Sequence, residues 1–253
     1  MNRSLLCAAF AACMVVWAGS AYANLLSNGE LTTPAGNHEA ADSWSKSEPT
    51  LDGSNNPIDA FRFQKATFAD WHDSTVPLSD NPGPDGDPLT NDLGGMWFRG
   101  FLGNNASNPG ILVDASAWQD VAAGSGRYRL NFHEKHEFYF QAAEAGVKLE
   151  FYQGLSLLGS SPTFDLLATP GTNTNSALVE PWFARTLVGD APAGTDTIRV
   201  LAFMEDGSDN QTVVTFKPQS LLLDGFELLA VPEPGSVVIA LLGLVGLAAF
   251  RRQ

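Results

Sequence analysis

The stretch RYRLNFH (127–133) carries apolar side chains at every second position. Tyr128, Leu130 and Phe132 fall on one face of an extended segment, and polar residues separate them. The stretch VKLEF (147–151) repeats the pattern. A side-chain period of two is typical of strands that bury one face against a second layer. These two stretches therefore predict half-buried strands.

Most of the remaining apolar stretches also favour strands. Helix signals are scarce, and the best, FYFQAAEAG (138–146), predicts at most two turns. Loops rich in Gly, Pro, Asn and Asp lie between the stretches, the longest at 79–95, and no repeat of fixed period is present. Many short strands with such connections predict an all-β, antiparallel β-sandwich or barrel. The further strand candidates are AFRFQKATF (60–68), MWFRGFL (96–102), WFARTLV (182–188), TIRVLAFM (197–204), QTVVTF (211–216) and SLLLDGFELL (220–229).

The N-terminal segment has the order of a secretory signal peptide. Arg3 precedes an apolar stretch from Leu5 to about Ala18, and Ala21-Tyr22-Ala23 follows. This order predicts a signal peptide over 1–23, with cleavage by signal peptidase between Ala23 and Asn24. A permanent membrane anchor is the alternative, but the apolar core is shorter than the roughly 20 residues that a spanning helix needs.

Both cysteines, Cys7 and Cys13, lie inside this predicted signal peptide. The mature chain would then have no disulfide, no thiol nucleophile and no thiolate metal ligand. Residues 24–230 are long enough for one large β domain, which must be held together by its apolar core.

The chain is strongly acidic, with 14 Lys+Arg against 28 Asp+Glu. Without Arg3, Glu233 and the two terminal arginines, the middle keeps 11 against 27, a net charge of about −16. Such a surface repels phosphate backbones, so nucleic-acid binding is not expected. An acidic surface is compatible with a soluble exported protein and with the binding of divalent cations.

The stretch VPEPGSVVIALLGLVGLAAFRRQ (231–253) has three ordered parts: the sequence Pro232-Glu233-Pro234, an apolar run over 237–250, and the pair Arg251-Arg252. It resembles the PEP-CTERM sorting signal of exported proteins of Gram-negative bacteria that make exopolysaccharide and biofilm. The resemblance implies recognition by an exosortase, a transpeptidase-like membrane enzyme that processes the chain near Pro-Glu-Pro. We assign the sorting signal to 231–253, with a hydrophobic helix at about 236–250.

The length of the apolar run agrees with a temporary membrane segment. Fourteen residues, 237–250, span about 21 Å as a helix, against a hydrocarbon core of about 30 Å. Arg251 and Arg252 are expected on the cytoplasmic side by the positive-inside rule. A permanent single-span anchor is the alternative. Both place the acidic domain outside the cytoplasmic membrane, at the cell surface or in the extracellular matrix.

The middle domain resembles the galactose-binding-like jelly rolls common among carbohydrate-binding modules. The resemblance rests on five short sequence motifs that follow one another in the same order as in that family. It implies an opening Asn-Leu-Leu strand, a hairpin over 119–132 and a closing pair of strands. Asp224-Gly225-Phe226 departs from the usual Asp-Asp/Asn-Val/Ile closing motif. The matching stretches are NLLSNGE (24–30), SWSKS (43–47), QDVAAGSGRYRLNF (119–132), APAGTDTIRVLAF (191–203) and LLLDGFEL (221–228).

Many jelly rolls of this type hold a structural calcium between the opening loop and the last strand. The resemblance places its carboxylate ligands at Glu30 and Asp224, with backbone carbonyls completing the shell. Calcium takes six to eight oxygen ligands, so two carboxylates are few. The alternative is that Asp224 ends a ladder and Glu30 faces water.

The sequence contains two further polar clusters. In HEKHEFYF (133–140), the residues His133, Glu134, His136 and Glu137 are candidates for binding a metal or hydrogen-bonding a sugar. A solvent-facing loop is expected instead, since His133 and His136 would point to opposite faces of a strand and the His-Glu-x-x-His zinc spacing is absent. The acidic residues of the long loop do not fit the helix-loop-helix calcium pattern, and a solvated loop is expected there. These are Asp80, Asp85, Asp87 and Asp92.

Sugar recognition needs an exposed aromatic ring with polar neighbours. Trp71, between Asp70 and His72, is the best candidate, whereas Trp97 and Trp182 lie in strand-like stretches and are expected in the core. No catalytic motif is evident. The sequence therefore predicts a non-catalytic exported sandwich that binds exopolysaccharide or another glycan. The alternatives are a purely structural surface protein and a polysaccharide-active enzyme.

Overall fold

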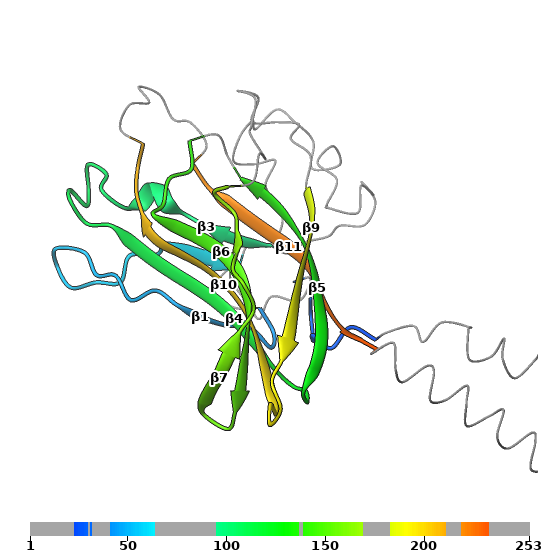
Figure 1. The fold of residues 1–253 in the computed structure, drawn as a ribbon. Helices are drawn as coiled ribbons and strands as arrows, with labels where there is room; N and C mark the ends of the chain where they lie inside the picture. The colour runs from blue at the N-terminus through cyan, green and yellow to red at the C-terminus, as the bar shows by residue number, and fades with distance from the viewer. Residues whose placement is uncertain are drawn as a thin grey trace, which may run out of the picture.

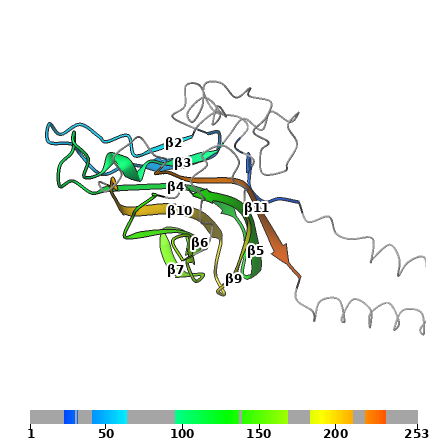
Figure 2. The same ribbon diagram turned by 90° about the horizontal axis from the view of Figure 1, so that it is seen from above.

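The computed structural model describes residues 23–29, 31, 41–63, 95–136, 139–168, 183–210 and 219–232. These residues form two antiparallel sheets packed face to face, one of six strands and one of five (Figures 1 and 2). They contain one 3-10 turn, η2 (Gly100–Leu102), and no α-helix. The predicted all-β antiparallel sandwich is confirmed.

The six-stranded sheet has the order β1-β4-β10-β6-β7, and β8 also pairs with β6. Its strands are β1 (Ser45–Ser47), β4 (Val113–Ala122), β10 (Thr197–Gly207), β6 (Glu144–Gln153), β7 (Ser156–Ser160) and β8 (Phe164–Asp165).

The five-stranded sheet has the order β2-β3-β11-β5-β9. Its strands are β2 (Phe61–Phe63), β3 (Met96–Phe98), β11 (Leu221–Val231), β5 (Gly126–His136) and β9 (Phe183–Ala191).

The strand order is that of a jelly roll. We number the eight principal strands β3, β4, β5, β6, β7, β9, β10 and β11 from first to eighth in chain order. One sheet then reads first-eighth-third-sixth and the other reads second-seventh-fourth-fifth. This arrangement is the double Greek key, in which consecutive strands alternate between the sheets except for the fourth and fifth, β6 and β7, which form a hairpin.

The alternating stretches form the interior of the sandwich. On β5, Tyr128, Leu130 and Phe132 are buried, while Arg127 and Arg129 are exposed. The predicted β6 face, Val147, Leu149 and Phe151, is buried in the same cluster, the last at 1% exposure. The period of two therefore gave both the strands and their buried faces correctly.

The predicted pairing of neighbouring strands is wrong at two places. The 119–132 stretch is not a hairpin, because β4 belongs to the six-stranded sheet and β5 to the other. Residues 123–125 carry the chain across the edge of the sandwich, where Ala123 N–H donates to the Asp196 carbonyl. The predicted closing pair, β10 and β11, is likewise divided between the sheets. Alternation shows which face of a strand is buried but not which strand pairs with it.

Two local predictions are also wrong. The helix expected over 138–146 is absent from its described part, since β6 begins at Glu144 and pairs with β10 (Glu205↔Glu144). Cross-strand pairing overrides the helix propensity of Ala and Glu there. HEKH (133–136) is not a loop either: it continues β5 and pairs with Leu221–Asp224 of β11.

The opening segment lies along β11 without forming the expected strand. Leu25 N–H donates to the Leu228 carbonyl at 2.9 Å, and Phe226 N–H donates to the Gly29 carbonyl at 3.0 Å. The Asn24 side chain accepts from Leu228 N–H and donates to the Phe226 carbonyl, both at 2.9 Å. The residue after the predicted signal cleavage site is therefore built into the last strand.

Several predictions fall outside the described residues. The sequence stretches concerned are 1–22, 64–94, 211–218 and 233–253, which include the predicted signal peptide, the long acidic loop, the strand at 211–216 and the apolar tail. Glu30 and Trp182 lie outside as well. Within the described part, no helix is long and apolar enough to cross a membrane.

The close approach of the opening segment to β11 requires a glycine at position 29. A Cβ on Gly29 would lie 2.0 Å from the Phe226 carbonyl oxygen, which is backbone and cannot move aside. We expect Gly29→Ala to lower the free energy of unfolding of the full chain by about 1–3 kcal/mol in a urea titration.

Gly53→Ala is the matched control, because nothing lies within 4 Å of its Cβ. It should change the free energy of unfolding by less than about 0.5 kcal/mol. Equal effects of the two substitutions would contradict the importance of the contact between Gly29 and β11.

Candidate functional site

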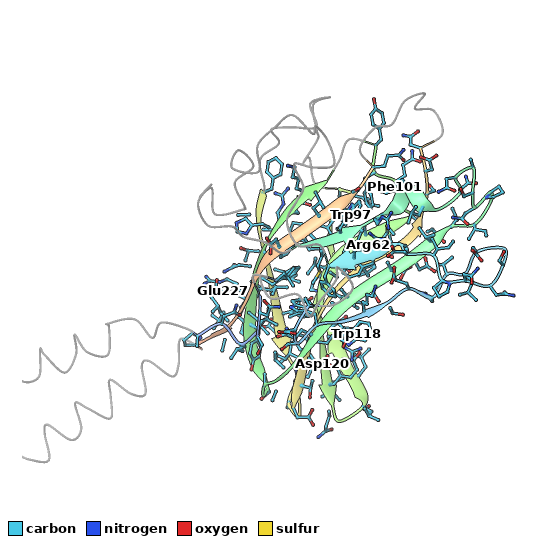
Figure 3. All side chains as sticks on the ribbon, turned by 180° about the vertical axis from the view of Figure 1, so that it is seen from behind. Arg62, Trp97, Phe101, Trp118, Asp120 and Glu227 are labelled. Carbon is cyan, nitrogen blue, oxygen red and sulfur yellow. The ribbon has the colours of Figure 1, made fainter. Side chains whose placement is uncertain are left out.

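The outer face of the six-stranded sheet carries a cluster of polar and aromatic side chains. Along β4 the inward positions are Val113, Ala115, Ala117, Gln119 and Val121, all buried. The residues between them point outward and are Asp114, Ser116, Trp118 and Asp120. Figure 3 shows Trp118 and Asp120 side by side on this face.

Strand register places Arg199 of β10 at the centre of the cluster. Arg199 lies opposite Asp120 of β4 on one side and opposite Glu150 of β6 on the other. Its guanidinium carbon is 5.1 Å from the centroid of the Trp118 ring and 5.2 Å from that of Tyr152. We call these five residues the Arg199 platform.

Asp120 fixes the guanidinium through two hydrogen bonds. Arg199 Nε donates to one carboxylate oxygen at 2.7 Å, and Nη2 donates to the other at 2.9 Å. These bonds raise the pKa of Arg199 further above its ordinary value. Two parallel bonds to a carboxylate define the plane of the guanidinium, so its orientation between the rings is set before any ligand arrives.

Glu150 holds the other side of the platform. Tyr152 Oη donates to its Oε2 at 2.6 Å, and Lys148 Nζ lies 3.0 Å from its Oε1. Burial, followed by the hydrogen bond and the charge of Glu150, raises the pKa of Tyr152 to about 12. The phenol therefore stays protonated and keeps donating at neutral pH.

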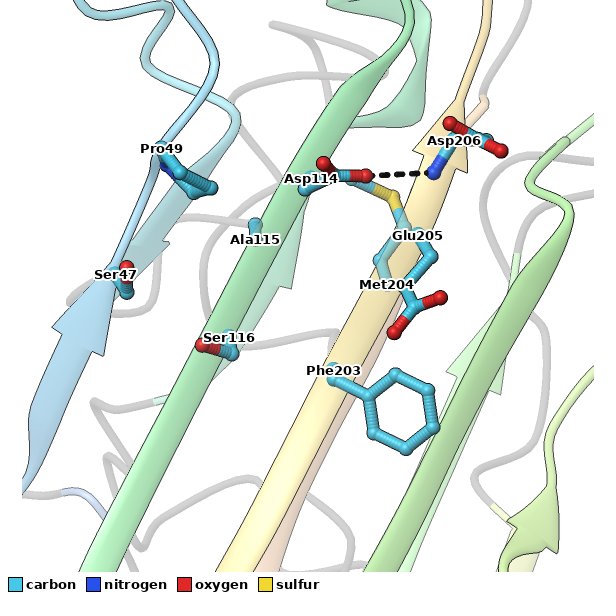
Figure 4. Close-up of a pocket in the computed structure, with 9 residues that line it drawn as sticks. All are labelled: Ser47, Pro49, Asp114, Ala115, Ser116, Phe203, Met204, Glu205 and Asp206. Carbon is cyan, nitrogen blue, oxygen red and sulfur yellow. Dashed lines mark hydrogen bonds between the residues drawn. The ribbon is translucent and has the colours of Figure 1, made fainter.

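A pocket of about 290 Å³ opens on the same face, farther along β4 and β10 (Figure 4). The β10 register against β4 shifts between Met204 and Gly207, which marks a β-bulge. Asp206, at φ 53°, donates its N–H to Asp114 Oδ1 at 2.9 Å. The lining residues are Ser47, Pro49, Asp114, Ala115, Ser116, Phe203, Met204, Glu205 and Asp206.

The tryptophans divide between interior and surface. Trp44 is buried in the core, and its ring lies 5.2 Å from that of Phe226. Trp97 is buried as expected, at 3% exposure, and Arg99 lies 4.7 Å from its ring. Trp118 is only half-buried and faces outward, whereas Trp71 lies outside the described residues.

Sequence reasoning missed Trp118, although the signal was present. In VDASAWQDV (113–121) apolar residues, interrupted by Gln119, alternate with Asp114, Ser116, Trp118 and Asp120. An aromatic residue in phase with polar ones marks the solvent face of a strand.

The histidine cluster does not form a metal site with described neighbours. Glu134 is fully buried and accepts a hydrogen bond from Arg185 Nε at 2.7 Å. Within the described ranges, no three His, Cys, Asp or Glu side chains gather as a metal site would require.

Asp224, the described member of the predicted calcium pair, is 2% exposed. Its Oδ1 accepts the Gly225 N–H at 2.7 Å, and two residues along, Phe226 bonds to the opening segment at Gly29. Glu30 lies outside the described residues, so the calcium site stays a prediction.

Comparison with known proteins identifies the tail. Residues 230–253 match the family model of the PEP-CTERM protein-sorting motif. The chain carries a PEP-CTERM sorting motif. This motif indicates an exported protein, and it begins inside β11, which ends at Val231. Pro232, the first residue after the strand, is exposed, and the rest of the motif lies outside the described residues. No curated protein matches the chain in sequence.

Solved structures with a similar fold include carbohydrate-binding modules. The TmCBM61 module in complex with β-1,4-galactotriose has a TM-score of 0.40 and 15% identity, covering 82% of this chain and 99% of that one. The CBM22-1 xylan-binding domain of Paenibacillus barcinonensis Xyn10C has a TM-score of 0.42 and 10% identity, with coverages of 85% and 99%.

The enzymatically active domain of tailspike protein 4 of bacteriophage CBA120 is also similar in fold, with a TM-score of 0.45 and 9% identity. The match covers 82% of this chain but only 21% of the tailspike chain. The expected jelly-roll fold of the middle domain is confirmed by the strand order of its two sheets.

The raised pKa of Tyr152 predicts a loss of stability in alkali. The unfolded chain loses this phenolic proton near pH 10 and the folded chain near pH 12. The contribution of Tyr152 to the free energy of unfolding should therefore be complete below about pH 10 and decline between about pH 10 and 12. Tyr152→Phe should remove this part of the decline, as measured by urea titrations across that range.

Ultraviolet titration of tyrosinate gives an independent check, with Glu150→Gln as the test variant and the unsubstituted protein as the reference. This substitution removes the charge but leaves an oxygen acceptor, so the late-titrating tyrosine should ionise at lower pH. An unchanged titration would show that Glu150 does not act on Tyr152.

The calcium prediction is tested by thermal unfolding. If Asp224 is a ligand, calcium should raise the melting temperature of the full chain and a chelator should reverse the rise, because a ligand bound only to the folded state stabilises it. Asp224→Asn keeps the side-chain shape but removes the charge, and should abolish most of the rise. No effect of calcium on the unsubstituted protein would exclude the site.

Proposed function

We propose that this protein is exported, processed by signal peptidase and an exosortase-type enzyme, and retained at the cell surface or in the matrix. Its sandwich binds exopolysaccharide without catalysis, through the Arg199 platform on the outer face of β4, β10 and β6. The sorting motif at 230–253 supports the first part. The geometry of the platform supports the second.

The observation that carries the proposal is the half-exposed Trp118 ring beside polar groups held in fixed positions. A sugar ring has an apolar face of C–H groups and an edge of hydroxyls, so it matches an aromatic face bordered by planar donors and acceptors. Asp120, at 43% side-chain exposure, presents acceptor oxygens next to that ring. None of the described residues bonds Nη1 of Arg199, which leaves a donor for a hydroxyl.

The platform is rigid before binding, which lowers the entropic cost of association. Arg199 is held by two bonds to Asp120 and by the rings of Trp118 and Tyr152. Tyr152 is in turn held by Glu150. Side chains that are ordered in the free protein lose little freedom when a ligand binds.

Charge favours a neutral glycan over a polyanionic one. Among the described residues, the platform and the pocket lining contain one cation, Arg199, and five carboxylates, with Lys148 beside Glu150. The carboxylates are those of Asp120, Glu150, Asp114, Glu205 and Asp206, and the middle of the chain carries about −16. Like charges facing one another across an interface are unfavourable, so a uronate-rich chain would be repelled. Ionised carboxylates accept hydrogen bonds from neutral sugar hydroxyls.

The test is retention of the full chain in affinity electrophoresis gels that contain the cells' own exopolysaccharide or a panel of neutral and uronate polysaccharides. Trp118→Ala should weaken binding by roughly 30-fold, corresponding to about 2 kcal/mol for the loss of a central aromatic anchor.

Phe101→Ala is the matched control. Phe101 is also a half-buried aromatic beside an arginine, 5.3 Å from Arg99, but it lies on η2 next to Trp97 of the other sheet. It should leave retention unchanged. Equal loss in both variants, or no retention of the unsubstituted chain by any glycan, would favour a purely structural surface protein. Release of sugars would favour an enzyme.

A further inference from the structure

The β6–β7 hairpin exposes an unusual amount of apolar surface. Leu155 at its tip is fully exposed at 101%, and Leu157 and Leu158 on β7 are exposed at 53% and 37%. Eight large apolar side chains are exposed in the described part of the chain, and three of them lie in this one hairpin. Residues 153–160, QGLSLLGS, contain no charged side chain.

The tip is a tight turn that cannot fold its leucine back onto the domain. Gln153 pairs with Ser156, so only Gly154 and Leu155 form the loop. Gly154 has φ 58°, as the first central position of a type II′ turn requires. Its N–H donates to Asp196 Oδ2 at 2.8 Å, which ties the turn to the beginning of β10.

Strand register places the hairpin tip and the end of β11 at the same end of the sandwich; in Figure 1 the hairpin is at the bottom and β11 ends to its right. Val231, the last residue of β11, pairs with Arg127 at the start of β5. The neighbouring residue Gly126 pairs with Ala191 at the end of β9. The turn that follows β9 reaches the hairpin, because a Cβ on Gly194 would lie 3.4 Å from the Gln153 side chain.

The position of the hairpin indicates which surroundings its leucines contact. The sorting motif starts at the end of β11, and its apolar run 237–250 enters the membrane under the proposed function. The end of the sandwich that contains Val231 must then face the bilayer. An uncharged, leucine-bearing turn at that end fits the boundary between headgroups and acyl chains, where apolar side chains are stabilised by leaving water.

We propose that the β6–β7 hairpin is a membrane-contacting element, which inserts Leu155 and Leu157 into the phospholipid bilayer that holds the tail. The hairpin and the tail together give the tethered domain two points of contact and so a fixed orientation. The inference rests on the sorting part of the proposed function and is independent of glycan binding.

The cysteine content of the chain makes a site-specific test possible. Cys7 and Cys13 are its only cysteines, so Cys7→Ser and Cys13→Ser leave none. Leu155→Cys is then labelled with a polarity-sensitive fluorophore, and the full chain is reconstituted in phosphatidylethanolamine–phosphatidylglycerol vesicles. The label should show a blue-shifted emission and should be quenched by lipids that carry a quencher in their acyl chains.

Leu112→Cys is the matched control. Leu112 is exposed at 43% and precedes β4, whose far end, Ala122, lies at the hairpin end of the sandwich. Ten strand residues separate the two ends, about 33 Å. A label at 112 should therefore show neither the shift nor the quenching.

The outcomes distinguish a failure of the hairpin inference from a failure of the membrane role of the tail. If the labelled chain floats with the vesicles but positions 155 and 112 behave alike, the hairpin inference is overturned and the sorting proposal stands. A chain that does not float overturns the membrane role of the tail and the hairpin inference with it. A blue shift without lipid that grows with protein concentration would mean association between copies and would also overturn the inference.

Discussion

The packing of Phe226 is the interaction on which the rest of this structure depends. Its ring stacks on Phe132 of β5 at 5.8 Å and lies 5.2 Å from Trp44, which precedes β1 of the opposite sheet. Its backbone N–H and carbonyl bond to Gly29 and Asn24 of the opening segment. One residue thus joins the last strand, a central strand, the other sheet and the beginning of the domain. The described residues contain no cysteine, so their cohesion depends on such burial.

The Asp224-Gly225-Phe226 sequence explains how this ring reaches the core. The pairing of β11 with β5 shifts register between Asp224 and Glu227, and Gly225 has φ 60°. A glycine with positive φ at this position is the signature of a β-bulge. The extra residue turns Phe226 inward while Asp224 stays buried. The departure from the usual closing motif therefore leaves the carboxylate buried and places an aromatic side chain in the core.

The sequence contains enough information to predict the strands and their buried faces, but not their partners. Tyr128, Leu130 and Phe132 could be assigned to the interior because a strand's side chains alternate regardless of its neighbours. Sheet membership depends on contacts far apart in the sequence, so the β4–β5 connection was mistaken for a hairpin. The local helix signal at 138–146 was overridden for the same reason, by pairing between β6 and β10.

The candidate site could be predicted only in part. The alternation of β4 is sufficient to place Trp118 on the solvent face, next to Asp120. Nothing local connects Trp118 to Arg199 or Tyr152, because these residues follow 81 and 34 positions later and meet it only through strand register. A site built across three strands depends on how the sheet is assembled. The pattern of one strand predicts only the residues that this strand contributes.

Strand register fixes the position of the Arg199 platform relative to the β6–β7 hairpin. Tyr152 lies opposite Thr197 in the row nearest the hairpin end, Arg199 lies in the next row, and the pocket around Asp114 lies farthest along β4. From Asp120 to Asp114 is six strand residues, about 20 Å. If the hairpin end rests on the bilayer, a glycan that follows the face from the platform to the pocket runs away from the membrane. The domain would then hold the polysaccharide pointing outward, an orientation that a single point of attachment would not impose.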